Sequence, residues 1–304
     1  MNLPGTTGAP APRPLQVAEV GAPDRRPRRA LRAFLRNPLA VAGVLLLGAV
    51  VLMATFAPIL YPNDPLDMVA QPFLWPGQRS GFLLGTDALG RDVAAGIAHG
   101  SRISLFVGIS ATVMGLATGI IVGSIAGYFG GRIDTFLVRL IELFQTIPQF
   151  VLLVVLVAIV QPSIGTITAA IGVVTWPTVA RLVRAEFRSL RERDFVMAAR
   201  SVGYGHRLII LREILPNALP PVIITSSVMV ASAILMESSL SFLGMGDPNL
   251  VSWGSMIGAG REALRTAWYL SAVPGVAIIL VVLALNFVGE GLNDALNPRY
   301  SAER

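Results

Sequence analysis

The sequence lacks two residue types altogether. None of its 304 residues is cysteine, and all 24 basic residues are arginine, so there is no lysine. Without cysteine the chain has no disulfide, no thiol nucleophile and no cysteine-ligated zinc. Without lysine it cannot be a P-loop NTPase, whose phosphate-binding loop needs one. Two histidines far apart in the sequence also argue against a histidine-based metal centre, and therefore against a soluble metalloenzyme or redox enzyme.

Charge is scarce as well. Only 14% of residues are charged, 54% are hydrophobic, and the mean hydropathy is +0.67, which is too apolar for a soluble domain. A membrane-crossing helix needs about 20 apolar residues, and five long stretches contain no Asp, Glu or Arg. The third stretch is divided by Gln161-Pro162-Ser163, a helix-ending signal. We therefore predict an all-α integral membrane protein with six transmembrane helices, at residues 39–60, 103–128, 143–160, 164–183, 218–237 and 268–290.

The arginines are distributed unevenly along the chain. Seven precede the first predicted span, and eight lie between Arg181 and Arg212. Because cytoplasmic loops retain positive charge, this bias predicts that both termini are cytoplasmic. It also explains the net charge of +6 without nucleic-acid binding, and Arg32 and Arg36 are expected to contact anionic lipid. Residues 1–36, rich in Pro and Arg, are expected to form a largely disordered cytoplasmic tail before a transmembrane domain at 37–304.

The longest predicted cytoplasmic connection, residues 184–217, contains several helix-ending and helix-starting signals. Asp194 can cap a short helix, Gly203 suits the left-handed position that closes a helix, and Pro216 can stop the next one. We therefore predict two short helices joined by a glycine corner. Ala198 and Ala199 leave little side-chain bulk on the first helix, so another protein's backbone could approach it closely. Composition alone favours a solvated loop whose arginines fix the topology.

The spacing of Ala198-Ala199, Gly203 and Ile214-Leu215-Pro216 resembles the EAA signature of permease subunits of ATP-binding-cassette importers. In that family the element is a coupling helix that sits in a cleft of the ATPase subunit and transmits its nucleotide-driven closure. The resemblance implies that 184–217 is an ATPase-coupling loop. Met197 stands where the signature has glutamate, so Asp194 or Glu192 is left to supply a carboxylate. The implied coupling residues are Asp194, Met197, Ala198, Ala199, Gly203, Gly205, Leu215 and Pro216.

Other stretches resemble the C-type permease of dipeptide and oligopeptide importers, in the family's order. They are residues 84–92 with 100–105, residues 237–246 with 252–254, and residues 286–299. The first stretch supplies an outer-loop marker made of Gly85, Thr86, Asp87, Gly90, Arg91 and Asp92. Asn293 and Asn297 depart from the last marker, where arginine and aspartate are expected.

The resemblance implies a non-catalytic permease subunit in a bacterial inner membrane, forming half of a pathway for di- or oligopeptides. Its implied partners are a second, B-type permease subunit, two ATP-binding-cassette ATPase subunits, an extracytoplasmic solute-binding protein and membrane lipid, with no nucleic acid. The chain itself would hold no cofactor, because the ATPase subunits would bind ATP and Mg²⁺. Related importers carry nickel complexes, glutathione or opines, so another small solute is an alternative.

Two other classes of function are weaker alternatives. An autonomous ion-driven transporter needs ionisable residues buried at mid-membrane and often paired half-length repeats, and neither is evident. An intramembrane enzyme would need a motif such as Gly-x-Ser-x-Gly or His-Glu-x-x-His, and the sequence has neither. Glu142 and Glu237 are expected at the ends of spans, where their carboxylates reach interfacial water.

The remaining marked residues have structural explanations. Thr86 or Asp87 can cap a short helix running toward Gly100, and Asp87, Arg91 and Asp92 can form a local ion pair. Contact with the partner permease or the solute-binding protein is the alternative for this group. Pro148 is expected to kink the third span. One smooth face for close helix packing is expected along the second span, from Gly115, Gly119, Gly123 and Gly127.

Overall fold

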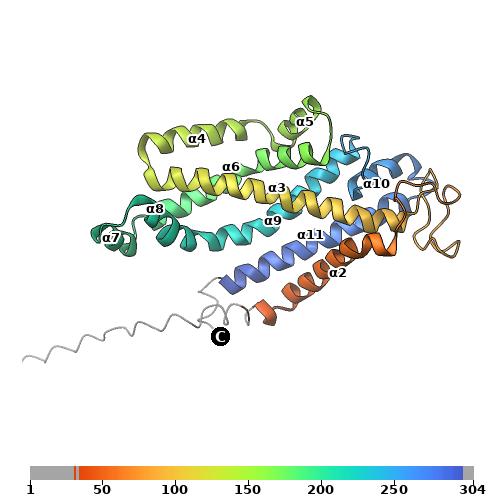
Figure 1. Cartoon of the computed structure of the whole chain (residues 1–304), viewed down its shortest axis with the longest axis horizontal. Coiled ribbons are helices and arrows are strands. Elements are labelled where there is room, and N and C mark those ends of the chain that lie inside the picture. Colours follow the sequence, from red (N-terminus) through yellow and green to blue (C-terminus); the bar gives the residue numbers. More distant parts are fainter. Residues whose placement is uncertain (1–30, 32–33, 297–304) are drawn as a thin grey trace, which may run out of the picture.

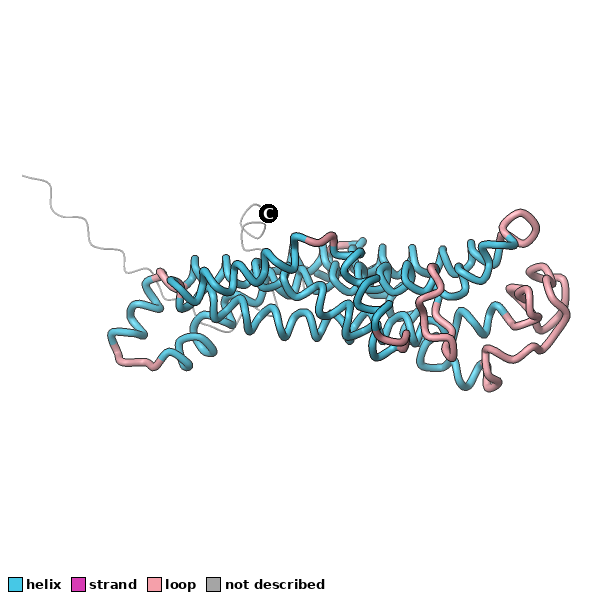
Figure 2. The backbone as a smooth tube through the Cα atoms, turned by 90° about the horizontal axis from the view of Figure 1, so that it is seen from above, coloured by secondary structure: helices cyan, strands magenta, loops and turns pink. Residues whose placement is uncertain are grey.

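The computed structural model describes residue 31 and residues 34–296, and within that part of the chain the regular secondary structure is entirely helical. Long helices run along the molecule, with loops at both ends and shorter connections between them (Figures 1 and 2). Arg32, Asn297 and most of the predicted tail lie outside the described residues. Helices long and apolar enough to cross a membrane are α2 (Pro38–Leu60), α3 (Val93–Phe129), α6 (Ile164–Leu190), the helical run His206–Phe242 that includes α9 (Leu215–Phe242), and α11 (Tyr269–Leu296).

Helix α3 begins ten residues before the predicted span. Asp92 caps it, because its Oδ1 accepts the Ala94 N–H at 2.9 Å. The expected cap at Thr86 or Asp87 is therefore wrong, and no separate short helix precedes Gly100. Arg102 bounds the charge-free stretch in the sequence, but it does not interrupt the helix, which is 37 residues long in all.

The third predicted span, 143–160, is broken rather than kinked. Helices α4 (Gly131–Thr146) and α5 (Gln149–Ile159) meet at an angle of 82°, so only the pair taken together makes a sixth candidate span. Ile147 is extended because a proline disfavours helical conformation in the residue before it. Pro148 therefore separates the two helices, which lie along one side of the bundle (Figure 1).

Helices α3 and α6 pack closely along the predicted glycine face. A methyl group added at Gly119 would lie 2.7 Å from Val179 Cγ1 and 2.9 Å from Trp176 O. Additions at Gly115, Gly123 and Gly127 would likewise collide with α6. The absence of side chains on this face brings the two helix backbones close together.

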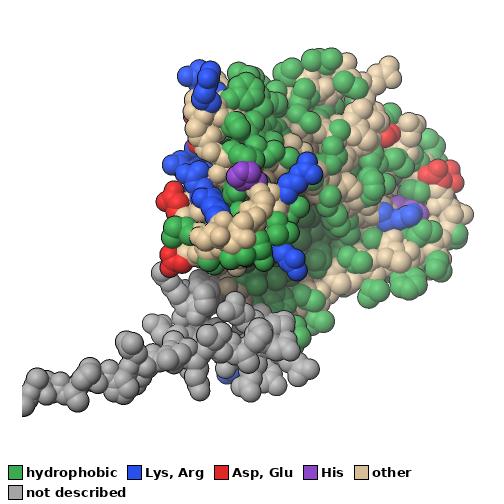
Figure 3. Space-filling model, turned by 60° about the vertical axis from the view of Figure 1, so that its left-hand side comes forward, with side chains coloured by type: hydrophobic (Ala, Val, Ile, Leu, Met, Phe, Trp, Pro, Cys, Tyr) green, Lys and Arg blue, Asp and Glu red, His purple; other side chains and the backbone are tan. Residues whose placement is uncertain are grey.

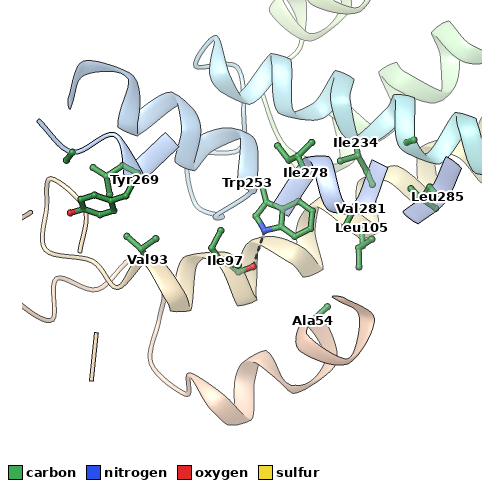
Figure 4. Packing of buried hydrophobic residues seen from close by; sticks show 13 residues of the cluster. Ala54, Val93, Ile97, Leu105, Ile234, Trp253, Tyr269, Ile278, Val281 and Leu285 are labelled. Carbon is green, nitrogen blue, oxygen red and sulfur yellow. Dashed lines mark hydrogen bonds between the residues drawn. The ribbon is translucent and has the colours of Figure 1, made fainter. Parts of the chain in front are cut away.

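A hydrophobic core lies near the end of the bundle that carries residues 61–92. Trp253, at the start of α10 (Trp253–Gly260), is fully buried among α3, α9 and α11, and its indole N–H donates to Ile97 O at 3.1 Å (Figure 4). Helices α2 and α11, which both contribute to this core, lie side by side (Figure 1). The indole hydrogen bond satisfies a buried polar group and fixes α10 against α3.

Candidate functional site

The segment that follows α6 forms a short helix at one end of the bundle. Helix α6 extends to Leu190, so it includes the first residues of the predicted 184–217 loop, and α7 (Asp194–Ser201) follows. The predicted Asp194 cap is wrong, because Arg193 occupies the capping position and its carbonyl already accepts the Met197 N–H. Asp194 lies in the first helical turn instead, where a negative charge interacts favourably with the helix dipole.

A left-handed glycine ends α7, as predicted. Gly203 has a φ of +89°, its N–H donates to Arg200 O at 2.9 Å, and the Tyr204 N–H donates to Ala199 O at 3.0 Å. These two bonds form a Schellman motif, which satisfies the free carbonyls at the end of the helix. A side chain added at Gly203 would meet no atom within 4 Å, so its restriction comes from the backbone angle alone.

The second short helix of the prediction is instead the start of a long one. Helix α8 (His206–Leu208), the π-helical turn η1 (Ile209–Ile214) and α9 form one continuous run. Pro216 lies in the first turn of α9, inside this continuous run, and it does not end the helix. The π-helical turn leads into it, with the Leu215 N–H donating to Ile210 O.

The inner side of this loop is anchored in the bundle. Val196, Ile209 and Ile214 are at most 1% exposed, and they pack with Tyr128 of α3 and Phe187 of α6. Among the predicted coupling residues, Ala199 and Leu215 are partly buried against this cluster. The exposed ones are Asp194, Met197, Ala198, Gly203, Gly205 and Pro216. The loop thus has a rigid inner side and an open outer side.

The outer side of the loop combines apolar and basic groups. Met197 is 50% exposed and Val202 is 76% exposed, while arginine side chains gather around the same end of the molecule (Figure 3). Glu192 is also exposed and pairs with Arg191 at 3.3 Å. Exposed apolar side chains next to an open corner are typical of a protein contact surface.

The six residues of the outer-loop marker lie at the opposite end of the bundle, where they shape the loop of residues 61–92. Thr86 is fully buried; its Oγ1 donates to Gln71 O at 2.6 Å and accepts the Leu74 N–H at 2.9 Å. Gly85 and Gly90 are buried too, with positive φ angles. The Tyr269 hydroxyl of α11 lies 2.7 Å from Thr86 O and 2.9 Å from Leu74 O. These contacts hold the loop on the bundle.

The local ion pair expected at Arg91 is not formed. The ion pairs among the described residues are Arg184–Asp134 and Arg191–Glu192. Asp87 Oδ1 instead accepts the N–H groups of Leu89 and Arg91 within its own turn, and Asp92 caps α3. Burial raises the pKa of Asp92, although the backbone amides bound to it act in the opposite direction.

A cavity of about 340 Å³ opens beside this loop, between residues 87–93 and residues 247–260. Its polar lining comes from Asp87, Arg91, Asp92, Asp247 and Ser255, and most of the remaining lining is apolar. The marker residues Asp87, Arg91 and Asp92 therefore border this space. The carboxylates of Asp87, Asp92 and Asp247 accept hydrogen bonds from backbone N–H groups.

The position predicted for Glu237, at the end of a span, is wrong. Glu237 is only 2% exposed, whereas a position at the interface was expected, because α9 continues to Phe242 and α10 covers it. Ser241 Oγ donates to Glu237 Oε1 at 2.7 Å, and Ser104 Oγ of α3 lies 3.5 Å from Oε2. Helix α9 thus buries an ionisable group near its C-terminal end, where a carboxylate in contact with interfacial water was expected. The serine-rich sequence after Glu237 was the available signal, but Ser104 is distant in sequence.

These features define a polytopic helical membrane protein with a short amphipathic helix at one end. Residues 119–302 match a family model described as the binding-protein-dependent transport system inner membrane component, and residues 27–76 match the N-terminal transmembrane domain of oligopeptide transport permease C. The chain therefore belongs to the family of binding-protein-dependent transport system inner membrane components. It is a multi-pass permease subunit of a bacterial inner membrane.

Similar proteins cover most of the chain. The di/tripeptide transport system permease protein DppC of Pseudomonas aeruginosa is 37% identical over 274 residues, covering 88% of this chain and 90% of the relative. The oligopeptide transport system permease protein OppC of Haemophilus influenzae is 36% identical, covering 89% and 88%. A chain of the MetNI methionine ABC transporter in an inward-facing conformation has the same fold, with a TM-score of 0.55 and 17% identity; the match covers 66% of this chain and 96% of that one.

Proposed function

We propose that this chain forms half of the translocation pathway of an ATP-binding-cassette importer for di- or oligopeptides. The names of the relatives DppC and OppC support the substrate class. The other half would be a B-type permease subunit, and a solute-binding protein would deliver the peptide from outside. Two ATPase subunits would bind ATP and Mg²⁺, because this chain has no lysine for a phosphate-binding loop.

The orientation in this proposal follows the arginines. The α7 end carries eight arginines between Arg181 and Arg212, so it lies in the cytoplasm together with both termini. The loop of residues 61–92 then faces outward, toward the solute-binding protein. This arrangement puts α7 on the side of the membrane where ATP is available.

The observation that carries the proposal is the construction of α7 and its corner. The inner side of the segment is anchored by Val196 and Ile209 in the same cluster as α3, α6 and α9. Its outer side exposes Met197, Ala198 and Gly203 to a partner. A force applied by an ATPase subunit to the outer side would therefore reach the membrane helices through packed side chains rather than through a flexible linker.

The test is Gly203→Val in the complete transporter, reconstituted with its ATPase subunits and solute-binding protein. A valine side chain would meet no neighbouring atom here, but the backbone angle φ of +89° is unfavourable for valine by at least about 1–2 kcal/mol. We expect the complex to assemble normally while the amount of peptide transported per ATP hydrolysed falls.

Gly77→Val is the matched control. Gly77 lies in the loop of residues 61–92, has a φ of +76°, and also has open space around an added Cβ. The same backbone strain is thus introduced at the opposite end of the molecule, where the transport ratio should be unchanged. An unchanged ratio in Gly203→Val would contradict the role of the α7 corner.

A further inference from the structure

The last turn of α3 is held between both sides of the α7 corner. Tyr128 is only 5% exposed, and its hydroxyl lies 2.8 Å from His206 Nδ1. The guanidinium carbon of Arg200 lies 5.8 Å from the centroid of the Tyr128 ring. Phe129 completes the group, with its ring centroid 5.1 Å from Tyr128 and 6.0 Å from His206. We call these four residues the aromatic clasp.

The clasp joins elements on either side of Gly203. Arg200 lies in the last turn of α7, whereas His206 is the first residue of α8. Cation–π and edge-to-face ring contacts depend on geometry, and the Tyr128–His206 hydrogen bond is directional. A displacement of the corner therefore acts on the end of α3 from both sides at once.

Helix α3 can carry such a displacement across the molecule. Its 37 residues correspond to about 55 Å, which takes it from Phe129 in the clasp to Val93 beside the loop of residues 61–92. It is packed against α6 through the glycine face, so the two helices are held together over much of this length. Arg191 adds a contact at the clasp end, because its Nη1 donates to Gly127 O at 3.3 Å.

We propose that Tyr128 and His206 are positioning residues for transport, and that their hydrogen bond transmits movement of the α7 corner to α3. Apart from Tyr128 itself, the buried cluster around Val196 consists of apolar side chains, so its contacts anchor the loop but lack the directionality of a hydrogen bond. The Tyr128–His206 hydrogen bond is the contact between α3 and the α7 corner that depends most on the position of the corner. This inference rests on the proposed coupling to ATPase subunits.

The experiment compares Tyr128→Phe, His206→Ala and the double variant in the complete transporter in proteoliposomes. Tyr128→Phe removes a single oxygen and keeps the ring contacts. Peptide uptake per ATP hydrolysed should fall about fivefold in each single variant, the factor expected for one lost hydrogen bond. The double variant should be no worse than the poorer single variant, because both changes break the same contact.

Two further variants separate coupling from folding. Tyr204→Phe removes the hydroxyl of an exposed tyrosine next to the same corner, and should leave the transport ratio unchanged. His206→Asn retains an acceptor close to the position of Nδ1, and should restore most of the ratio lost in His206→Ala. The amount and thermal stability of the assembled complex are measured for every variant. If His206→Ala assembles poorly, Tyr128→Phe decides the test.

Wild-type transport ratios in both single variants would overturn the proposal, as would losses that multiply in the double variant. Lower stability with an unchanged ratio would show a purely structural role and would also overturn it. If the wild-type complex shows no ATP-driven peptide uptake, the proposed function itself fails, and the clasp proposal fails with it. If the wild type and the variants all couple peptide uptake to ATP hydrolysis equally well, the clasp proposal is rejected and the proposed function stands.

Discussion

The glycine face between α3 and α6 predicts a clear asymmetry between two Gly→Ala substitutions. At Gly119, the added methyl would lie 2.7 Å from Val179 Cγ1 and 2.9 Å from the carbonyl oxygen of Trp176. Ordinary contact distances are about 3.5–4.0 Å, so the helices must separate by roughly 1 Å. At Gly48 of α2, nothing lies within 4 Å of an added Cβ.

The expected magnitudes follow from these distances. Overpacking costs about 1–3 kcal/mol, and replacing a helical glycine by alanine returns about 0.5–1 kcal/mol. Gly119→Ala should therefore lower the free energy of unfolding by about 1–2 kcal/mol, whereas Gly48→Ala should leave it unchanged or raise it slightly. With about 2–4 °C per kcal/mol, the two variants should differ in Tm by several degrees.

The measurement is the thermal unfolding of each detergent-solubilised variant, with the same partner subunits present throughout. Gly48→Ala controls for the general effect of a methyl group on a transmembrane helix. Equal melting temperatures for Gly119→Ala and the wild type would refute the close packing of α3 on α6. A lower melting temperature in Gly48→Ala alone would reverse the predicted order.

Two predictions concern the end of the bundle opposite α7. Glu237→Ala removes the acceptor for Ser241 and leaves a cavity, so the free energy of unfolding should fall by about 2–4 kcal/mol. Glu237→Gln keeps the side-chain volume, so its free energy of unfolding should fall by less. Equal melting temperatures for both variants and the wild type would contradict this burial. Tyr269→Phe removes the hydroxyl that contacts Thr86 O and Leu74 O, and should cost about 1–3 kcal/mol. Limited proteolysis should then cut residues 61–92 faster than in the wild type; an unchanged cleavage rate would show that this hydroxyl does not hold the loop.

Much of the fold could be predicted because membrane helices exclude charge along most of their length. This signal placed α2 and α11 to within one residue at their starts. It missed the first ten residues of α3, where Arg102 was taken as a boundary, although a charge near a membrane surface does not end a helix. It also joined α4 and α5, because hydropathy does not report that Pro148 breaks the helix.

The local geometry of the site was predictable where one residue type determines it. Gly203 is an example, because its left-handed angle strongly favours glycine. Pro216 is a counterexample, since a proline can either follow a helix or start one, and the π-helical turn before it decides the matter. The burial of Glu237 and the contacts of the aromatic clasp could not be predicted. Ser104 meets Glu237, and Tyr128 meets His206, only after the bundle has formed.

The most direct test of the central claim is to purify the complex from its own membrane through a tag on this chain and identify the other proteins by mass spectrometry. A permease driven by separate ATPases should copurify, in fixed stoichiometry, with P-loop ATPase subunits and a second multi-pass permease. Peptide-loaded solute-binding protein should then stimulate ATP hydrolysis by that complex. Purification of this chain as a homo-oligomer without an ATPase would contradict the claim and would favour an autonomous transporter.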